Sequence, residues 1–409
     1  MNINIKHAYY RAFQAVFGVG ARALPWKKAI PVSGAGSISR IPDILSKENK
    51  HHPMVVTDPG LVKAGVAQKI LDVLDTAGVQ YALYSDVEPN PTVETVNKIT
   101  ALYRAEGCDS FVAIGGGSAM DAAKGANARI TKPKKNIHQL GGVLKILKPT
   151  QLFIAVPTTA GTGSETTIAA LITDTTTHHK YAVMDVFLIP KYAVLDPELT
   201  LGLPPHITST TGMDALTHAV EAYLSWTYNT AETRRFALEA TEAIFANLEK
   251  VYANGSDIEA RKAMMLASYK AGFAFTRASV GNIHAIAHTL GGLYNTPHGL
   301  ANAVIMPIVL EDYGEKVHTK LTHLAFAAGI ADASSGEAQN ANAFIQAIYG
   351  MNERMNIPKG FDNIKDEDIN QMVIWALKEA NPLYPVPVIF DADRFKRVIE
   401  KVRTPKETE

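Results

Sequence analysis

Two histidine-containing segments in the second half of the chain have spacings that could hold a metal ion. Asp214 and His218 lie four residues apart in a helical pattern, and His284 and His288 repeat this spacing further along. Residues four apart share one face of a helix, so each pair can present two donor atoms to the same ion. His298 follows in a break between helical patterns. A single pair would more simply be an ordinary hydrogen bond on a helix face, but five such residues in apolar surroundings favour a metal site.

The spacing does not decide which four of these five side chains are ligands. Imidazole nitrogen and carboxylate oxygen, without a thiolate, suit iron(II), zinc, manganese or nickel. The pattern therefore predicts a site for a divalent metal and leaves the choice of ion open.

A glycine-rich turn in the first half of the chain could bind a phosphate group. Gly115, Gly116, Gly117 and Ser118 follow an apolar run and come before a helical pattern whose first turn holds Asp121. Glycine lets the backbone approach a ligand closely, and a helix start offers free N–H groups at its positive end. The simpler interpretation is a tight strand-to-helix turn without a ligand.

A second loop strengthens the phosphate interpretation. Residues 157–165 read Pro-Thr-Thr-Ala-Gly-Thr-Gly-Ser-Glu, with hydroxyl groups at Thr158, Thr159 and Thr162, and they also follow an apolar run. Two such loops after parallel strands suit a pyrophosphate at the carboxyl ends of a sheet.

Asp58 could select between the two nicotinamide dinucleotides. It ends an apolar run at residues 54–57, where an acidic side chain commonly accepts from the adenosine 2′-hydroxyl and repels a 2′-phosphate, which predicts NAD over NADP. Its alternative role is a turn residue before Pro59 and Gly60. The Gly-x-Gly-x-x-Gly fingerprint is absent at this place, so the standard Rossmann motif is not predicted.

The elements that must position these residues follow from the hydrophobic pattern. Apolar runs of strand length at residues 54–57, 81–84, 111–114 and 153–156 alternate with helical patterns, which predicts βαβ units and a parallel sheet. Beyond Pro204 and Pro205 the chain is almost entirely helical in period. We therefore predict an α/β NAD-binding domain at residues 29–200 and an all-helical metal and substrate domain at residues 201–409.

The first 28 residues form a basic amphipathic leader without an acidic residue. Its lysines and arginines are Lys6, Arg11, Arg22, Lys27 and Lys28. Gln14, Gly18 and Gly20 interrupt its apolar stretch, so a secretory signal is not predicted. The favoured interpretation is a helix packed on the enzyme, and the alternatives are an organelle transit peptide or a membrane-surface helix.

Composition excludes several classes of protein. The 409 residues carry 40 Lys+Arg and 40 Asp+Glu, a formal net charge of +0, which argues against a dedicated nucleic-acid or membrane-surface protein. The single cysteine, Cys108, rules out an internal disulfide framework and a thiolate-rich metal site. No stretch approaches 18 uninterrupted apolar residues, so no transmembrane segment is expected. These features predict a cytoplasmic enzyme or binding protein.

Taken together, the motifs resemble those of the iron-containing (group III) alcohol dehydrogenase family, over nearly the whole chain beyond residue 30. The first half carries Val-Thr-Asp58, Pro-Asn90-Pro-Thr, Gly-Gly-Gly-Ser-x-x-Asp-x-x-Lys124 and the loop at 157–165. The helical half carries Gly-x-Asp-x-x-x-His-x-x-Glu221, then His-x-x-x-His-x-Leu-Gly from residue 284 and Pro-His-Gly at 297–299. The resemblance implies an architecture like that of dehydroquinate synthase, with an α/β domain before an all-α metal-binding domain.

The resemblance also implies roles for individual residues. The implied metal ligands are Asp214, His218, His284 and His298, while His288 would lie beside them, near the substrate and nicotinamide. Pyrophosphate contacts would come from the glycine turn and from Thr158, Thr159 and Thr162. Asn90 would contact the adenosine side and Lys180 the nicotinamide ribose. The family further implies a homodimer with iron(II) and NAD, with zinc or another divalent metal and NADP as alternatives.

The implied activity is that of an NAD(P)-dependent alcohol dehydrogenase acting on a small alcohol, or on an aldehyde or ketone in reverse. The metal would polarise the substrate oxygen, hydride would pass to nicotinamide, and His288 could relay the proton. Arg277, where many members carry Asn, places a cation near the expected substrate cavity. The alternatives are a non-redox metal- and NAD-using lyase or synthase, which would need more phosphate-binding cations, and a scaffold protein, which only the leader supports.

Overall fold

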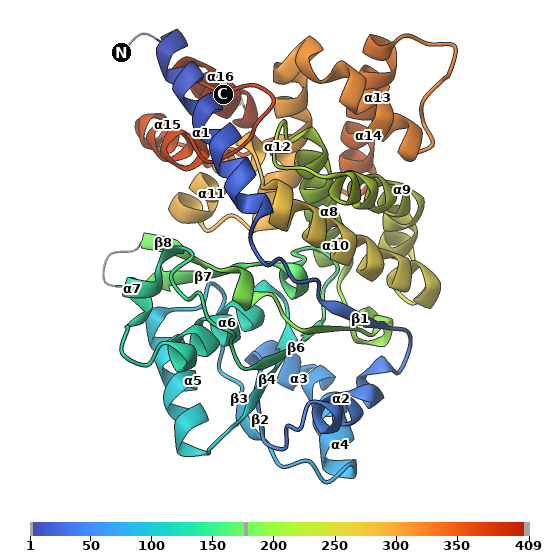
Figure 1. Cartoon of the computed structure of the whole chain (residues 1–409). Helices are drawn as coiled ribbons and strands as arrows, with labels where there is room; N and C mark the ends of the chain where they lie inside the picture. Colours follow the sequence, from blue (N-terminus) through green and yellow to red (C-terminus); the bar gives the residue numbers. More distant parts are fainter. Residues whose placement is uncertain (1–2, 176–178, 405–409) are drawn as a thin grey trace. The chain divides into compact units, whose positions relative to one another are not determined.

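The computed structural model describes residues 3–175 and 179–404, and these form two compact units (Figure 1). An α/β unit comprises Pro25–Gly202, and a helical unit comprises Met1–Leu24 together with Leu203–Glu409. The helical unit is therefore discontinuous in sequence, because its first helix precedes the α/β unit. Among the described residues, no helix is long and apolar enough to cross a membrane.

The α/β unit is built on the parallel sheet that the sequence predicts. Within the described part of this unit, the main sheet has the strand order β1-β9-β6-β4-β2-β3, and all of its neighbouring strands pair in parallel. The strands are β1 (Ile30–Ser33), β2 (Pro53–Val56), β3 (Ala82–Tyr84), β4 (Ser110–Gly115), β6 (Leu152–Pro157) and β9 (Tyr192–Leu195). Strands β2, β4 and β9 are buried throughout, as expected when helices cover both faces of a parallel sheet.

Alternate residues of these strands build two apolar cores. Val55, Val112 and Ile154 are partners across three strands and pack in one cluster, while Met54, Phe111 and Phe153 occupy the neighbouring register and pack in the other. The helices of this unit are α2 (Ile41–Lys47), α3 (Pro59–Lys63), α4 (Val66–Thr76), α5 (Val93–Ala105), α6 (Gly117–Thr131) and α7 (Ile137–Leu140). A small second sheet, absent from the sequence-based prediction, pairs β5 (Gly142–Val143), β8 (His179–Met184) and β7 (Ala169–Asp174).

The helical unit confirms the helical pattern expected for the second half of the chain. Its long helices are α1 (Ile3–Arg22), α8 (Pro205–Leu224), α9 (Ala231–Ala253), α10 (Ile258–Ala278), α11 (Asn282–Tyr294) and α12 (His298–Tyr313). It continues with α13 (His318–Ala327), α14 (Glu337–Arg354), α15 (Asp366–Ala380) and α16 (Ala392–Val402). Side-chain caps at Thr230, Asp257 and Asp391 start α9, α10 and α16. Helix α8 is buried on every face from Gly212 onward, so its polar residues face protein.

The leader forms helix α1, which packs on the helical unit. Arg22, at its end, donates to the carbonyl of Thr227, and Phe17 packs against Tyr228 with ring centroids 5.5 Å apart. The helix ends at Arg22, six residues before the end of the predicted leader, and the α/β unit begins at Pro25.

Candidate functional site

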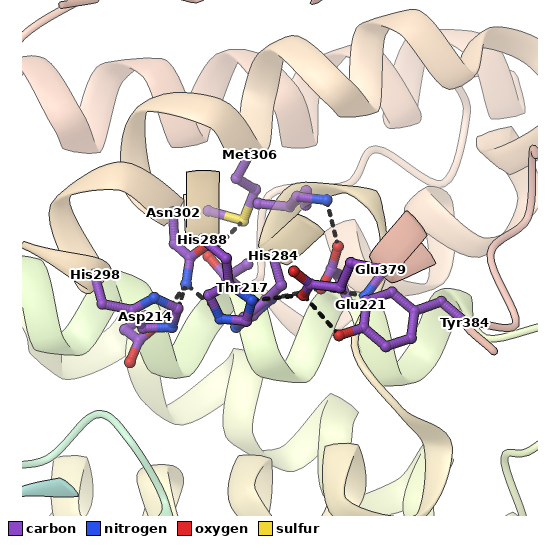
Figure 2. A network of polar contacts seen from close by, with 12 residues as sticks. Asp214, Thr217, Glu221, His284, His288, His298, Asn302, Met306, Glu379 and Tyr384 are labelled. Carbon is purple, nitrogen blue, oxygen red and sulfur yellow. Dashed lines mark hydrogen bonds and ion pairs between the residues drawn. The ribbon is translucent and has the colours of Figure 1, made fainter. Parts of the chain in front are cut away.

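Four side chains from three helices converge in the helical unit. Figure 2 shows Asp214, His284 and His298 of this group. Asp214 and His218 come from α8, His284 from α11 and His298 from α12, and one donor atom of each lies within 4.8 Å of the others. Asp214, His218 and His284 are 2%, 4% and 2% exposed, whereas the side chain of His298 is 40% exposed. The cluster is therefore embedded in the helices on most sides and accessible at His298.

A close approach of two helices brings His298 to Asp214. Gly299 follows His298 in the first turn of α12, and a Cβ at this glycine would lie 2.3 Å from the carbonyl oxygen of Thr210 and 3.3 Å from Cβ of Asp214. Only glycine allows this contact without a shift of the α8 backbone. The Pro-His-Gly sequence thus sets both the start of α12 and its distance from α8.

The donor set fits a divalent metal ion. The Nδ2 group of Asn302 donates a hydrogen bond to Asp214 Oδ1 at 2.7 Å and lies 3.2 Å from Nε2 of both His284 and His298. Three potential metal-ligand atoms therefore surround the Asn302 amide nitrogen. Burial and the neighbouring imidazoles hold the pKa of His284 well below its usual value, which keeps this ring neutral. A neutral imidazole with a free lone pair is the form that binds metals.

Glu221 orients His284 by binding Nδ1, the ring nitrogen that faces away from the cluster. Its carboxylate accepts from the backbone N–H groups of Gly281 (2.7 Å) and Ile283 (2.8 Å) and from His284 Nδ1 (2.6 Å), which leaves Nε2 of His284 directed at the cluster. Burial raises the pKa of Glu221, while its hydrogen bonds to the backbone N–H groups act in the opposite direction and favour the carboxylate. A Cβ at Gly281 would lie 2.8 Å from Glu221 Oε1, so any larger residue there would displace this carboxylate. The sequence held one signal for this role, because Glu221 lies one helical turn after His218.

His288 lies beside the four converging residues but outside their group. Its ring stacks on His298 with centroids 5.1 Å apart, and its Nδ1 lies 2.5 Å from Glu379 Oε1 (Figure 2). Tyr384 donates its hydroxyl hydrogen to the same oxygen at 2.8 Å. Burial and Glu379 raise the pKa of Tyr384 well above its usual value, so this phenol remains a donor. Sequence reasoning missed Glu379 and Tyr384, because no spacing links them to a histidine about ninety residues earlier.

In the α/β unit, the two predicted phosphate loops are neighbours. Strands β4 and β6 pair in parallel with Gly115 opposite Pro157, and the N–H of Thr158 donates to the carbonyl of Gly115 at 3.1 Å. A Cβ at Gly116 would lie 3.5 Å from Thr159 Oγ1, and one at Gly117 would lie 3.5 Å from Thr162 Cγ2. The glycine turn and the hydroxyl-rich loop therefore face each other at the start of α6.

Two further predicted residues, Asp58 and Asn90, lie next to this turn. Asp58 Oδ1 caps α3 by accepting from the N–H of Leu61 at 3.0 Å, and its Oδ2 would lie 3.5 Å from a Cβ at Gly115. Asn90 has a left-handed backbone, with φ at 57°, and its N–H donates to Ser118 Oγ at 3.3 Å. Asp58 is thus the cap of α3, a role that was not predicted, and its second oxygen also lies near the glycine turn.

Two family-level matches divide the chain as the structure does. Residues 30–197 match the protein family described as "Iron-containing alcohol dehydrogenase". Residues 208–402 match the family described as "Fe-containing alcohol dehydrogenase family, C-terminal". The chain belongs to the iron-containing alcohol dehydrogenase family. Both matched ranges lie after α1, the helix that the leader forms.

Individual relatives agree with this assignment. The chain is 39% identical over 376 residues to Alcohol dehydrogenase 4 of Schizosaccharomyces pombe, which covers 88% of this chain and 87% of that protein. It is 36% identical over 350 residues to the NAD-dependent methanol dehydrogenase of Bacillus methanolicus, with 85% and 91% coverage. Its fold is similar to the crystal structure of a 1,3-propanediol oxidoreductase, with a TM-score of 0.88, 33% identity, and coverage of 93% of this chain and 100% of that one.

The remaining residues named from the family resemblance have varied surroundings. Arg277 pairs with Glu232 at 3.5 Å and lies 4.4 Å from the ring centre of Phe273, so a carboxylate already offsets its charge. This position therefore adds little to the phosphate-binding cations that a lyase or synthase would need.

The backbone of Lys180, in β8, pairs with that of Thr173 in β7. The side chain of Lys180 lies outside the described part of the structure.

Asp121 and Lys124 of α6 hold the hydroxyl-rich loop from inside the protein. Asp121 accepts from Ser164 Oγ at 3.2 Å and from the N–H of Leu171 at 3.1 Å. The fully buried Lys124 directs its ammonium group at five oxygens of Ser164, Thr167 and Ala169, at 2.6 to 3.1 Å. Burial lowers the pKa of Lys124 to about 8, while Asp121 and Glu165 act in the opposite direction. Both side chains are therefore placed to shape the loop.

Replacing Lys124 by methionine is expected to raise the dissociation constant of NADH about tenfold or more, equivalent to about 1.4 kcal/mol. The loop would lose its buried donor, and its hydroxyl groups would no longer be held in place. Metal content should not change, because Asp214 and the three converging histidines belong to the helical unit. Fluorescence titration with NADH and elemental analysis measure both quantities. Lys69→Met, at an exposed position of α4, is the control. Unchanged NADH affinity in a folded Lys124→Met protein would contradict this role.

Proposed function

We propose that this protein is an NAD-dependent dehydrogenase that oxidises a small primary or secondary alcohol and reduces the corresponding aldehyde or ketone. The observation that carries the proposal is the convergence of one carboxylate and three imidazoles within 4.8 Å, in a chain of the iron-containing alcohol dehydrogenase family.

Asp214, His218, His284 and His298 would hold a divalent metal, for which the family description favours iron(II) and the donor chemistry also allows zinc. When bound, such an ion supplies a Lewis acid that lowers the pKa of an alcohol hydroxyl. Asp214 contributes the one negative charge of this ligand set, which leaves a net positive site that favours an alkoxide. Glu221 fixes the ring of His284, because its carboxylate binds the nitrogen that faces away from the cluster.

His288 would receive the proton that leaves the substrate hydroxyl. Glu379 holds Nδ1 of this ring, so Nε2 is the atom available for proton transfer. Tyr384 donates to Glu379 and keeps its carboxylate oriented toward the imidazole. This arrangement lets His288 act in turnover without belonging to the ligand set.

NAD would bind at the carboxyl ends of β4 and β6 in the α/β unit. The glycine turn, Ser118 and the threonines of the facing loop would contact the pyrophosphate. Asp58 and Asn90 would contact the adenosine side, and Lys180 the nicotinamide ribose. The nicotinamide ring supplies the hydride acceptor, and the protein orients it.

A spectroscopic assay tests the proposal. Purified protein, prepared without chelator and analysed for bound metals, is incubated with NAD and a panel of small alcohols, and with NADH and the matching aldehydes. Appearance or loss of NADH absorbance that depends on the bound metal is expected. No turnover of any member of the panel by metal-loaded protein would refute the proposed activity.

We further propose that the enzyme is a cytoplasmic homodimer. The dimer rests on the form implied by the family resemblance, and the compartment rests on the composition. Light scattering of the purified protein should give a mass near twice 44.2 kDa. A monomer at working concentration would overturn the first proposal, and localisation of the protein to an organelle would overturn the second.

Cofactor preference should depend on the charge of Asp58. A carboxylate at about 4 Å from the 2′-phosphate of NADP repels it by roughly 4 kcal/mol at an effective dielectric of about 20, and solvent would reduce this to roughly 1–3. NAD should therefore be preferred about tenfold to a hundredfold. Asp58→Asn removes the charge but can still cap α3, because asparagine caps helices about as well as aspartate. The measurement is kcat/KM for both cofactors, and an unchanged ratio in Asp58→Asn would show that Asp58 acts only as a cap.

A further inference from the structure

Gln14 is a fully buried polar residue in α1, the helix formed by the basic leader, and is 0% exposed. Its Nε2 donates to the carbonyls of Pro382 (3.0 Å) and Tyr384 (2.7 Å). Its Oε1 accepts from Trp226 Nε1 (2.6 Å) and from Arg11 Nη1 (3.0 Å). A glutamine amide has two donor hydrogens and two acceptor lone pairs, so the side chain is fully engaged. Such satisfaction of a buried amide indicates a specific docking of α1.

Arg11, one turn earlier, binds the same segment of chain. Its Nη1 donates to the carbonyl of Val386 at 2.7 Å and its Nη2 to that of Pro387 at 3.0 Å, while its guanidinium lies 5.1 Å from the ring centre of Trp226. Arg11 is half-buried, and this burial lowers the pKa of its guanidinium. Removing either Arg11 or Gln14 would leave carbonyl groups of this segment without these donors.

The segment at residues 382–388 depends on side chains for its position. Pro382, Pro385 and Pro387 lack N–H groups and cannot donate backbone hydrogen bonds, and the segment forms neither a helix nor a strand. Instead, each of its seven carbonyls accepts a hydrogen bond from elsewhere in the helical unit. The donors are Gln14 for residues 382 and 384, Tyr228 for 383, the N–H of Trp226 for 385, Arg11 for 386 and 387, and Asn282 for 388. Helix α1 therefore supplies the donors for four of these seven carbonyls.

This segment carries Tyr384, whose hydroxyl binds the Glu379 oxygen that also contacts His288. We propose that α1 is a positioning element of the active site, in which Gln14 and Arg11 hold segment 382–388 so that Tyr384 and Glu379 orient His288. This inference rests on the proposed role of His288 in turnover. A transit peptide or a membrane anchor would not need these buried bonds, and the family-level matches begin only after α1. The helix is thus an addition to the matched region that acts on a residue inside it.

The test compares Gln14→Ala with Tyr384→Phe in the otherwise intact, metal-loaded protein. Gln14→Ala should lower kcat about tenfold, with metal content and NADH affinity unchanged and a smaller effect on KM for the alcohol. If α1 acts through Tyr384, the double variant should be no slower than the slower single variant, because residues in one network are not additive. Val16→Ala, on the exposed side of the same helix, is the control and should keep full activity. An unchanged kcat in Gln14→Ala, or a double variant whose loss is the product of the two single losses, would overturn the proposal.

A second measurement separates this inference from the proposed function. Hydrogen exchange at the amides of Leu383, Tyr384, Val386 and Val388 reports the mobility of the segment without any turnover. Exchange there should be at least tenfold faster in Gln14→Ala than in wild type, and Arg11→Lys, which keeps one charged donor, should lie between them. Faster exchange in a protein that turns over no alcohol would refute the proposed activity while supporting the docking of α1. Equal exchange in Gln14→Ala and wild type would overturn the inference, and if Gln14→Ala does not fold, Arg11→Lys decides between these outcomes.

Discussion

His218→Ala and His298→Ala are each expected to lose tightly bound metal and at least a thousandfold in kcat/KM. The four ligand residues come from three helices. With one ligand removed, the other three would bind the ion more weakly and leave it more exposed to solvent. Metal polarisation of the substrate oxygen provides several kcal/mol of transition-state stabilisation, and about 1.4 kcal/mol corresponds to a factor of ten. Elemental analysis after dialysis and the NADH absorbance assay measure the two effects.

His298→Ala is the more informative of these variants, because this side chain is 40% exposed and its removal leaves little unfilled space in the core. Thermal unfolding should therefore show a folded protein without its metal. His206→Ala, at an exposed position near the start of the same helix as His218, should keep both metal and activity. A full equivalent of tightly held metal in His298→Ala would show that the ligand set is wrong.

His288→Ala is expected to keep its metal and its affinity for NADH while kcat falls about a hundredfold to ten-thousandfold, the usual contribution of a positioned acid or base. The reason is geometric, since His288 lies outside the group of four and its Nδ1 is bound to Glu379. Single-turnover measurements of hydride transfer, with metal analysis of the same sample, test this expectation.

Glu379→Gln should have a smaller effect than His288→Ala, because it weakens the orientation of the ring without removing it. The comparison with His284→Ala is decisive for the assignment. If His288→Ala loses metal to the same extent as His284→Ala, then His288 is a ligand and the proton-transfer role is wrong.

The candidate site could be foreseen only in part from the sequence. Helical spacing identified the right faces of α8 and α11, but it offered five candidates, and only the family resemblance separated His288 from the others. The structure brings together the four residues that the resemblance named, and it directs His288 toward Glu379 instead. Glu379 could not be predicted, because it lies in α15 and no helical spacing links it to a histidine 91 residues earlier. Tyr384 could not be predicted, because the proline-rich segment that carries it has no period that reveals which way its side chains point.

For the fold, too, features set by local sequence patterns could be predicted, whereas features that depend on contacts between distant residues could not. Apolar runs of strand length alternating with helical patterns predicted the parallel sheet, and the carboxyl ends of neighbouring parallel strands had to place the two phosphate loops together. The small sheet of β5, β8 and β7 was missed because β5 has only two residues and pairs with a strand about forty residues away. Asp121 looked like part of the phosphate turn, yet it bonds to the neighbouring loop through a contact 43 residues away. Lys124 makes a similar contact 40 residues away, for which the sequence offered no signal.

The discontinuity of the helical unit has a consequence for how the chain is assembled on the ribosome. Helix α1 is synthesised before the α/β unit, whereas Val386, which accepts from Arg11, follows that arginine by 375 residues. The α/β unit, Pro25–Gly202, is continuous and can fold as soon as it emerges. Helix α1 cannot dock until the last quarter of the chain has been synthesised, and until then Gln14 and Arg11 remain hydrated. The bonds that hold Tyr384 are therefore among the latest to form during biosynthesis, and a nascent chain released before Pro382 would lack all the bonds that Gln14 and Arg11 make to this segment.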